Sequence, residues 1–166
     1  ERALKFISIV QRYFEGGEAQ DEEARQRASV LALTQRWQEN PPDHPILVAG
    51  STGSRGTTFH LMTAVAGLPQ GAVVLPGFDF DMPRRVWAQL SDPKTSEDHP
   101  QYRFSRLLNA LELTSDHVTP WTAAEPQAAA RNRLVSLALR PAPVTHHWRQ
   151  EGPHLTKLDQ ATQDIT

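Results

Sequence analysis

Apolar residues recur at helical spacing over the first forty positions of the chain. In residues 3–15 they stand three or four positions apart and two glycines follow, which predicts a helix that ends there. Residues 21–39 open with acidic side chains, which favour the positive end of a helix dipole, and carry an apolar stripe that includes Val30 and Trp37. The sequence NPPDHP then ends this second predicted helix, because proline cannot donate the next backbone hydrogen bond.

Beyond this proline-rich stretch the pattern changes to that of an α/β protein. The apolar run PILVA is followed by a glycine-rich loop and by TTFHLMTAVAGL, whose apolar periodicity predicts a helix. A second apolar run, Ala72–Leu75, comes soon afterwards. Two short strands joined by a helix of about a dozen residues form a βαβ unit with parallel pairing and a right-handed crossover. Neither run alternates with polar residues, which is typical of a sheet covered on both faces.

The rest of the chain predicts helices joined by polar loops. We expect a helix over residues 82–90 with a proline near its start, a polar loop over 91–100, and a helix over 101–113 with one apolar face. The segment TSDHVTPW predicts a short strand, TAAEPQAAARNRLVSLALR a long alanine-rich helix, and GPHLTKLDQAT a final weak helix. The pattern as a whole predicts a helical segment over residues 1–41 and an α/β domain over residues 42–166.

Composition and charge narrow the classes of function. Lys and Arg number 17 and Asp and Glu 19, which gives a formal net charge of -2. A domain that binds nucleic acid alone usually has a pI above about 9, so any DNA contact would come from a local patch or from other parts of an assembly. The absence of cysteine excludes disulfides and thiolate-held zinc or iron–sulfur clusters within these residues. No apolar run approaches the roughly 20 residues that span a bilayer, and we expect a cytoplasmic protein with no membrane partner.

The two ends of the sequence resemble cuts. The chain begins without methionine and already in helical rhythm, and it stops at TQDIT, which reads like the start of a strand. Natural termini are more often loose polar tails. We therefore expect the chain to be a piece of a larger protein.

The stretch GSTGSRGTT has the shape of a phosphate-binding loop without its chemistry. A Walker loop, G-x-x-x-x-G-K-[ST], needs a lysine after its second glycine, but alignment on Gly56 places Thr57 there. Alignment from Gly50 places Arg55 where the second glycine belongs. A Rossmann G-x-G-x-x-G also fails, because Gly50, Gly53 and Gly56 are three positions apart throughout.

Two interpretations of this loop remain open. In the first, it is a strand-to-helix turn in which Thr57 or Thr58 caps the helix. In the second, the helix N-terminus binds a nucleotide or another anion weakly. The residues that would contact such an anion are Ser51, Thr52, Gly53, Ser54, Arg55, Gly56 and Thr57.

Two polar segments further along the chain are also candidate sites. Asp79 and Asp81 follow the second strand and could hold Mg²⁺ or form a polar turn, and we favour the turn because no phosphate-binding lysine is near. The segment EDHPQYRF could contact a nucleotide base or a DNA phosphate. Its alternative is the start of a helix, with Asp98 as the cap and Gln101 solvated.

Short basic and histidine-rich spots complete the candidates. By hypothesis, five residues contact DNA or a partner protein: Arg84, Arg85, His99, Gln101 and Arg103. The RNR sequence at Arg131–Arg133 is a solvated helix face by default. His146, His147 and His154 lack metal-ligand spacing on one helical face. No catalytic triad or carboxylate pair is recognisable, so we predict no catalytic residue and no metal site.

Several of these segments together resemble a known family. The sequence PILVAGSTGSRGTTFHLMTAVAGLPQGAVVLPGFDFDMP, a following tryptophan at Trp87, EDHPQYRFSRLL and ALRPAPVTHHW resemble the AddB family of double-strand break repair proteins, in the form found in alphaproteobacteria. The likeness runs over most of the chain from about residue 25. Its most specific parts in combination are AGSTGS, LPQGAVVLPG and DHPQ.

The resemblance implies a fold and a function. It implies a subunit of the AddAB helicase–nuclease, which processes duplex DNA ends for recombinational repair together with an AddA-like partner. It further implies the end of a helical insertion over residues 1–41, followed by an incomplete RecA-like domain whose ATPase motifs have decayed. An iron–sulfur cluster and Mg²⁺ would belong to a nuclease domain that these residues lack, so no cofactor is expected in this piece.

Under this resemblance, the strand at Ile46–Ala49 occupies the place where active helicases carry an acidic, Mg²⁺-binding motif. No carboxylate stands there in this chain. We therefore expect the piece alone to be catalytically silent, with an architectural or DNA-channel role. Two alternatives remain: a small nucleotide- or phosphate-binding enzyme that uses the Gly50–Thr58 loop with Asp79 or Asp81, and a DNA-binding module that acts alone.

Overall fold

A computed structural model describes residues 5, 7 and 22–155 of the chain. The helix predicted over residues 3–15 therefore lies almost entirely outside the described residues. The described elements are α2 (Glu22–Glu39), β1 (Ile46–Ala49), α3 (Gly56–Ala66), β2 (Gly71–Val74), α4 (Arg84–Trp87), α5 (Pro93–Ser96), α6 (Tyr102–Ala110), α7 (Ala129–Ala138) and α8 (His147–Glu151), with 3₁₀ turns at Ala88–Ser91, Ser115–His117, Ala142–Val144 and Gly152–His154.

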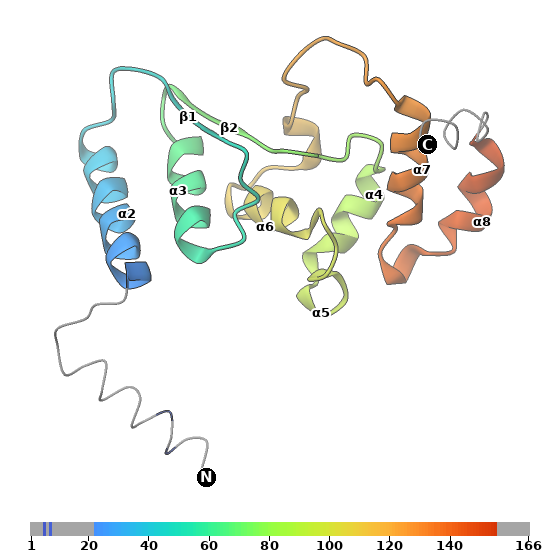
Figure 1. Ribbon diagram of the computed structural model, residues 1–166, viewed down its shortest axis with the longest axis horizontal. Coiled ribbons are helices and arrows are strands. Elements are labelled where there is room, and N and C mark those ends of the chain that lie inside the picture. The colour runs from blue at the N-terminus through green and yellow to red at the C-terminus, as the bar shows by residue number, and fades with distance from the viewer. Residues whose placement is uncertain (1–4, 6, 8–21, 156–166) are drawn as a thin grey trace.

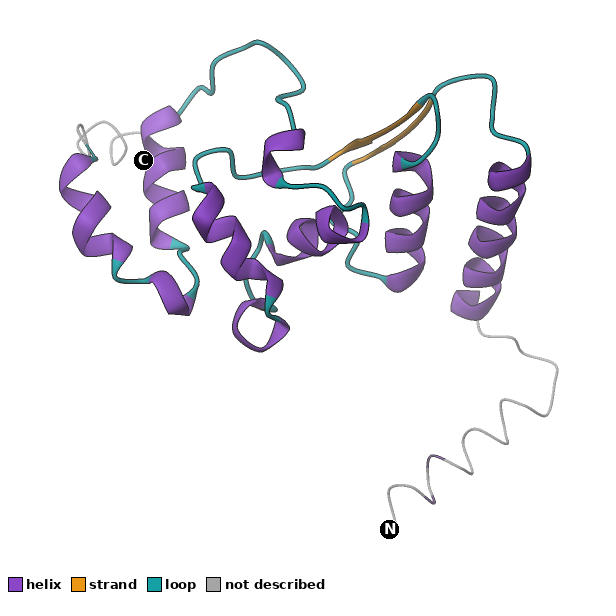
Figure 2. Cartoon of the chain, turned by 180° about the vertical axis from the view of Figure 1, so that it is seen from behind, coloured by secondary structure: helices purple, strands orange, loops and turns teal. Residues whose placement is uncertain are grey.

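The elements follow one another along the length of the molecule. Figure 1 shows α2 and α3 side by side near one end, with β1 and β2 running from them toward the middle. Helices α4, α5 and α6 occupy the middle, and α7 and α8 form the other end. Seen from behind in Figure 2, the two strands are the whole of the described sheet.

The predicted βαβ unit is confirmed. Strands β1 and β2 pair in parallel, with a register that runs from Ile46 opposite Gly71 to Ala49 opposite Val74. The second strand lies one residue earlier than the predicted Ala72–Leu75. Helix α3 packs on both strands and α2 packs on α3, so the fold is α/β with its helices layered on one side of the sheet.

The other face of the sheet is open along β1, whereas all four residues of β2 are half-buried, so the prediction of a sheet covered on both faces is wrong for β1 among the described residues. Ile46 and Val48 are half-buried against α3, whereas Leu47 between them is 53% exposed. A continuous apolar run therefore does not report which faces of a short strand are covered. Close packing on the α3 side involves Gly71, where a Cβ would lie 1.7 Å from the carbonyl oxygen of Val65.

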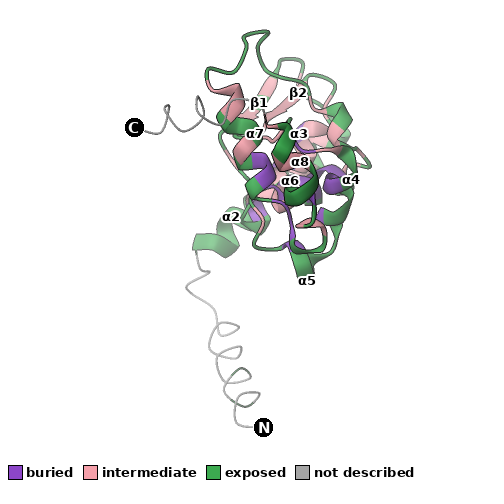
Figure 3. Cartoon of the chain, turned by 90° about the vertical axis from the view of Figure 1, so that its right-hand side faces the viewer, coloured by how far each residue is buried: buried purple, intermediate pink, exposed green. Residues whose placement is uncertain are grey.

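The main apolar core lies in the middle of the molecule, beside the carboxyl end of β2. It consists of buried side chains from α4, the following 3₁₀ turn and α6: Met82, Val86, Trp87, Leu90 and Phe104. The ring of Phe78, just after β2, stacks on Trp87 with a centroid distance of 4.6 Å. As predicted, α6 presents an apolar face, and Figure 3 shows buried positions gathered around α4 and α6.

Several predicted elements differ from the structure. The helix expected over 82–90 is split into α4 and a 3₁₀ turn, and the polar loop over 91–100 contains α5. The strand expected in TSDHVTPW is absent from the structure as described. Val118 has extended backbone angles, but no neighbouring strand pairs with it.

The C-terminal helices are shorter than expected. Helix α7 begins only at Ala129, after Pro126, which disfavours helical geometry in the residue before it. Helix α8 was not predicted, and the final segment forms a 3₁₀ turn at Gly152–His154 before the described residues end. Among the helices that are described, none is long and apolar enough to cross a lipid bilayer.

Candidate functional site

Two loops follow the carboxyl ends of the parallel strands and emerge from the same edge of the sheet. Residues 50–55 connect β1 to α3, and residues 75–83 connect β2 to α4. In open α/β folds, ligands collect at this edge. The N-terminal part of α6 and the residues before it contact both loops, which makes this region the candidate site.

The glycine loop after β1 is mostly exposed and is held by few hydrogen bonds. Gly50 and Gly53 have positive φ angles of 77° and 66°, a region that glycine adopts without strain. The backbone N–H of Gly53 donates to the Ser51 hydroxyl oxygen at 3.2 Å. From outside the loop, the Arg103 guanidinium donates to the Ser54 carbonyl oxygen at 3.3 Å.

The expected threonine cap is absent. Helix α3 starts at Gly56, and Arg55 is its N-cap residue, with extended backbone angles and no capping hydrogen bond from its side chain. Thr57 lies inside the first turn and is buried, so the prediction that Thr57 or Thr58 caps the helix is wrong. The first backbone N–H groups of α3 therefore have no side-chain acceptor from the N-cap residue.

Positive charge gathers around this loop. Arg103 lies on it, and the Arg106 guanidinium sits 4.6 Å from the centre of the Phe59 ring in α3. Arg55 has no side-chain partner in the part of the chain that the structure describes. The arrangement offers guanidinium groups and backbone N–H groups to an anion, but no lysine.

The loop after β2 is held by one buried side chain. Gln101 is 8% exposed, its amide Nε2 donates to the Gly77 carbonyl oxygen at 2.8 Å, and its Oε1 accepts from the Asp79 N–H at 3.2 Å. The alternative interpretation in which Gln101 is solvated is therefore wrong. Because both ends of its amide are used within the protein, the side chain holds the loop in place.

His99 continues this chain of hydrogen bonds. Its Nδ1 accepts from the Gln101 backbone N–H at 3.1 Å, so Nε2 carries the proton and donates to the Leu139 carbonyl oxygen at 2.6 Å. Burial lowers the pKa of the imidazole, although the Leu139 carbonyl partly offsets that effect. The neutral ring thereby links the start of α6 to the end of α7.

Asp79 and Asp81 lie in the polar turn that the sequence favours. The Oδ1 of Asp79 accepts from the Asp81 backbone N–H at 3.0 Å, which is an Asx-type turn. Burial and the negative charge of Asp79 raise the pKa of Asp81, while Arg133, with its Nε 3.9 Å from the carboxylate, acts against them. In residues 5, 7 and 22–155, no three histidine or carboxylate side chains are close enough to hold a metal ion.

The two predicted polar segments meet in one cleft. A hollow of about 270 Å³ separates the loop after β2 from α7. Its polar lining consists of Asp79, Asp81, His99, Gln101, Asn132 and Ser136. The structure thus brings together candidates that lie twenty residues apart in the sequence, and it adds Asn132 and Ser136 from α7, which the sequence analysis missed.

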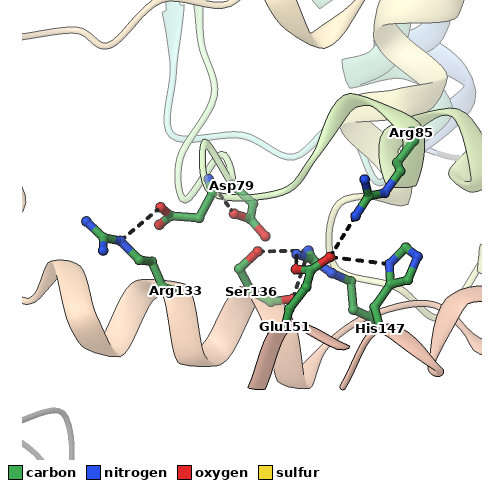
Figure 4. A network of polar contacts seen from close by, with 8 residues as sticks. Asp79, Arg85, Arg133, Ser136, His147 and Glu151 are labelled. Carbon is green, nitrogen blue, oxygen red and sulfur yellow. Dashed lines mark hydrogen bonds and ion pairs between the residues drawn. The ribbon is translucent and has the colours of Figure 1, made fainter. Parts of the chain in front are cut away.

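A partly buried ion-pair network, which the sequence analysis does not predict, lies close to this cleft (Figure 4). The side chain of Arg140 is 3% exposed, and its guanidinium donates to the Ser136 hydroxyl at 3.1 Å and to the Glu151 carboxylate at 3.0 Å. Arg85 donates to the other oxygen of Glu151 at 2.9 Å. Arginine is usually exposed, so nothing in the sequence distinguishes Arg140 from the solvated arginines.

The protonation of this network follows from its geometry. Burial opposes charge on Glu151, but hydrogen bonds and positive charge from Arg140 and Arg85 outweigh it and lower the pKa of the carboxyl group. Burial lowers the pKa of His147, whose Nδ1 is 3.7 Å from Glu151, too far for a hydrogen bond. The network therefore favours the ionised form of the Glu151 carboxyl group, which lies between two guanidinium groups, and the neutral form of the adjacent His147 imidazole.

The other predicted contact residues are also engaged within the protein. Arg84 pairs with Asp116 at 3.0 Å, and Arg85 belongs to the network just described. Both arginine side chains remain about two-thirds exposed, at 71% and 65%. The His146 ring packs edge-on against the His147 ring.

Comparison of the chain with protein-family models, with curated proteins and with solved structures gives no match.

Proposed function

We propose that this chain is part of an AddB-like subunit of a DNA double-strand break repair helicase–nuclease, and that its role there is architectural. In this proposal the α/β unit is a partial RecA-like domain without an ATPase or nuclease site of its own. It packs against an AddA-like motor subunit in the cytoplasm and helps to form the channel for duplex DNA ends. Any iron–sulfur cluster or Mg²⁺ would belong to a nuclease domain elsewhere in the parent protein.

One observation carries the proposal: the three segments with the most specific family likeness meet in space. DHPQ ends at Gln101, which holds the Gly77 carbonyl at the end of LPQGAVVLPG. Arg103, two positions later, holds the Ser54 carbonyl at the end of AGSTGS. Segments that serve one structural site explain why a family signature would contain all three, although the hydrogen bonds do not by themselves specify a DNA-repair role.

The residues of the glycine loop support a helicase-like domain without ATPase activity. Phosphoryl transfer requires a cation at the outer phosphates and a carboxylate-held Mg²⁺. The loop after β1 has Thr57 in place of the lysine, and residues 46–58 contain no carboxylate. We therefore expect the purified chain neither to hydrolyse ATP nor to cut DNA.

A test in cells addresses the repair role directly. Deletion of the gene is expected to lower survival after double-strand breaks, and the wild-type gene should restore it. A gene carrying Gln101→Leu should restore survival poorly, because the contact between two of the signature segments is lost. Normal survival of the deletion strain would overturn the proposed function.

A biochemical test addresses the absence of catalysis. ATP turnover by the purified chain is measured for the wild type and for Arg55→Ala and Gly56→Asp. No turnover above buffer is expected for any of them. Turnover that depends on the wild-type chain and is abolished by these substitutions would contradict the proposal.

A small nucleotide- or phosphate-binding enzyme is the second candidate, because the N-terminus of α3 lacks a side-chain cap and Arg55 has no partner among the described residues. Thermal unfolding with ATP and Mg²⁺ separates the two. A true site with ligand at 100 times its Kd would add about 2.7 kcal/mol of stability, which is readily measured. We expect no such shift.

A further inference from the structure

Strand β2 has one free edge. It pairs with β1 on one side, and the described residues contain no third strand on the other. The Ile46 N–H donates to the Gln70 carbonyl at 3.0 Å, so in this parallel ladder alternate residues, Ala72 and Val74, direct their peptide groups toward β1. The N–H and C=O of Val73 therefore point outward, where no described backbone or side-chain group bonds to them.

A groove of about 700 Å³ runs along β2. All four residues of the strand line it, together with apolar side chains of α6 and of the segment that follows α6. Trp121 stands at the groove and is 70% exposed. Leu47 of β1, which pairs with Ala72 of β2, is 53% exposed.

The lining has a distinct electrostatic character. None of the residues that line the groove is Lys, Arg, Asp or Glu, and His117 is the one titratable side chain among them. An occupant that placed a charge there would lose hydration without gaining an ion pair. The lining therefore matches an uncharged occupant, in contrast to the arginine-rich surroundings of the glycine loop.

The strand edge defines the conformation of that occupant. A helix satisfies its own peptide groups and would leave those of Val73 unpaired. An extended chain aligns N–H and C=O groups with the edge of β2 and buries alternate side chains against the groove. Parallel sheets are normally covered by other parts of the protein. The unpaired edge of β2 and the groove beside it therefore both favour an added strand as the partner.

We propose that the groove along β2 is a docking site for an extended, uncharged strand supplied by a partner polypeptide, which adds to the free edge of the sheet beside Trp121. This inference rests on the strand edge and the groove, not on the repair function, and it holds or fails separately. The strand adds backbone hydrogen bonds at Val73 and apolar contacts at Trp121.

Random displayed peptides of about eight residues, selected on the 166-residue chain, test the proposal. Enriched peptides should contain an uninterrupted run of uncharged, strand-forming residues. On binding, amide hydrogen exchange at Val73 should slow by at least about tenfold, as expected for a newly formed, stable hydrogen bond. Exchange is read by NMR at single residues, so the strand edge is observed directly.

A matched pair of surface substitutions completes the experiment. Trp121→Arg places a charge at the groove and should weaken binding at least about tenfold, which corresponds to about 1.4 kcal/mol. Trp148→Arg changes a residue that is 49% exposed on α8, outside the groove, and should leave binding unchanged. Thermal unfolding confirms that both variants are folded.

Three outcomes would overturn the proposal. The first is that no peptide is enriched on the wild-type chain. The second is that enriched peptides bind Trp121→Arg as tightly as the wild type. The third is that they bind in a helical conformation and leave exchange at Val73 unchanged, which would assign the face to a helix. None of these outcomes bears on the repair function.

Discussion

The loops after β1 and β2 both begin at the carboxyl ends of the two parallel strands, but they are held in place differently. The first has the composition of a phosphate-binding motif and is mostly exposed, with one hydrogen bond of its own and one from Arg103. The second matches no motif and is held at two backbone groups by the buried Gln101. Glycine content therefore indicates only how freely the backbone of a loop can bend. The hydrogen bonds of a buried polar side chain determine which of the two loops has a fixed position.

The glycines themselves show the same contrast. Gly56, at the motif-like loop, has open space where a Cβ would be, whereas Gly71 in β2 lies against the backbone of Val65. Of these two glycines, close packing against backbone requires the one in the strand, which belongs to no motif.

The largest expected difference in the free energy of unfolding is between the alanine variants of the two glycines, Gly71 and Gly56. Gly71→Ala would place a Cβ 1.7 Å from a backbone oxygen that cannot rotate away, and should lower the free energy of unfolding by about 3 kcal/mol or more. Gly56→Ala should leave it unchanged or raise it by up to about 1 kcal/mol, because alanine favours the helix. Urea unfolding of both variants measures the difference. Equal losses would remove the contrast between the two loops.

The next effect concerns the side chain that holds the second loop. Gln101→Leu keeps the volume but leaves the Gly77 carbonyl and the Asp79 N–H without their partner, which should cost about 2 kcal/mol. Ser51→Ala, the matched change in the first loop, removes a single half-buried hydrogen bond and should cost less than about 1 kcal/mol. Chemical denaturation compares the two. A larger loss for Ser51→Ala would reverse the comparison.

A smaller change in folding stability is expected when the pH is lowered. The pKa of His99 is lowered in the folded state below its ordinary value of 6.5, so the unfolded chain takes up the proton first as the pH falls. Folding stability should therefore decrease as the pH drops below about 6.5, and recover above it. His99→Gln should flatten this slope between about pH 7.5 and about pH 5.5.

His147 contributes a pH dependence of the same sign, because burial also lowers its pKa. The difference between the wild type and His99→Gln, measured by urea unfolding at both pH values, isolates the part due to His99. An unchanged slope in the variant would show that the hydrogen bonds of His99 to Gln101 and Leu139 do not constrain its protonation.

The smallest effect tests the contact between α6 and the glycine loop. Arg103→Gln removes an exposed hydrogen bond of 3.3 Å to the Ser54 carbonyl and should change stability by less than about 0.5 kcal/mol. Amide exchange over residues 50–55 should nevertheless speed up, while exchange over residues 77–79 stays as it was. Faster exchange in both loops would mean that they open as one unit.

Much of the fold was predictable because it depends on local signals. The acidic start and proline end of α2 and the apolar runs of β1 and β2 each predict an element that the structure confirms within a residue or two. The missing strand near Val118 and the unpredicted α8 show the limit. A strand exists only if a partner strand is beside it, and a helix as short as His147–Glu151 carries too little periodicity to be recognised.

The candidate site was predictable only in part. The sequence singled out His99, Gln101, Asp79 and Asp81, but not that they share a cleft, and it suggested a solvated Gln101 where the structure has a buried one. No pattern in the sequence predicts the ion pair between Arg140 and Glu151. Neighbours in space cannot be inferred from positions that lie tens of residues apart when no motif links them.

The parallel βαβ unit, the missing phosphate-binding lysine and the lack of cysteine can be predicted from the sequence, because they depend on residue identity and on neighbours a few positions away. The burial of Gln101, the enclosure of Arg140 with Glu151 and the unpaired outer edge of β2 among the described residues follow only from the packing of distant segments. Burial depends on which distant segments pack together, and the cost of removing a polar group from water is settled only there.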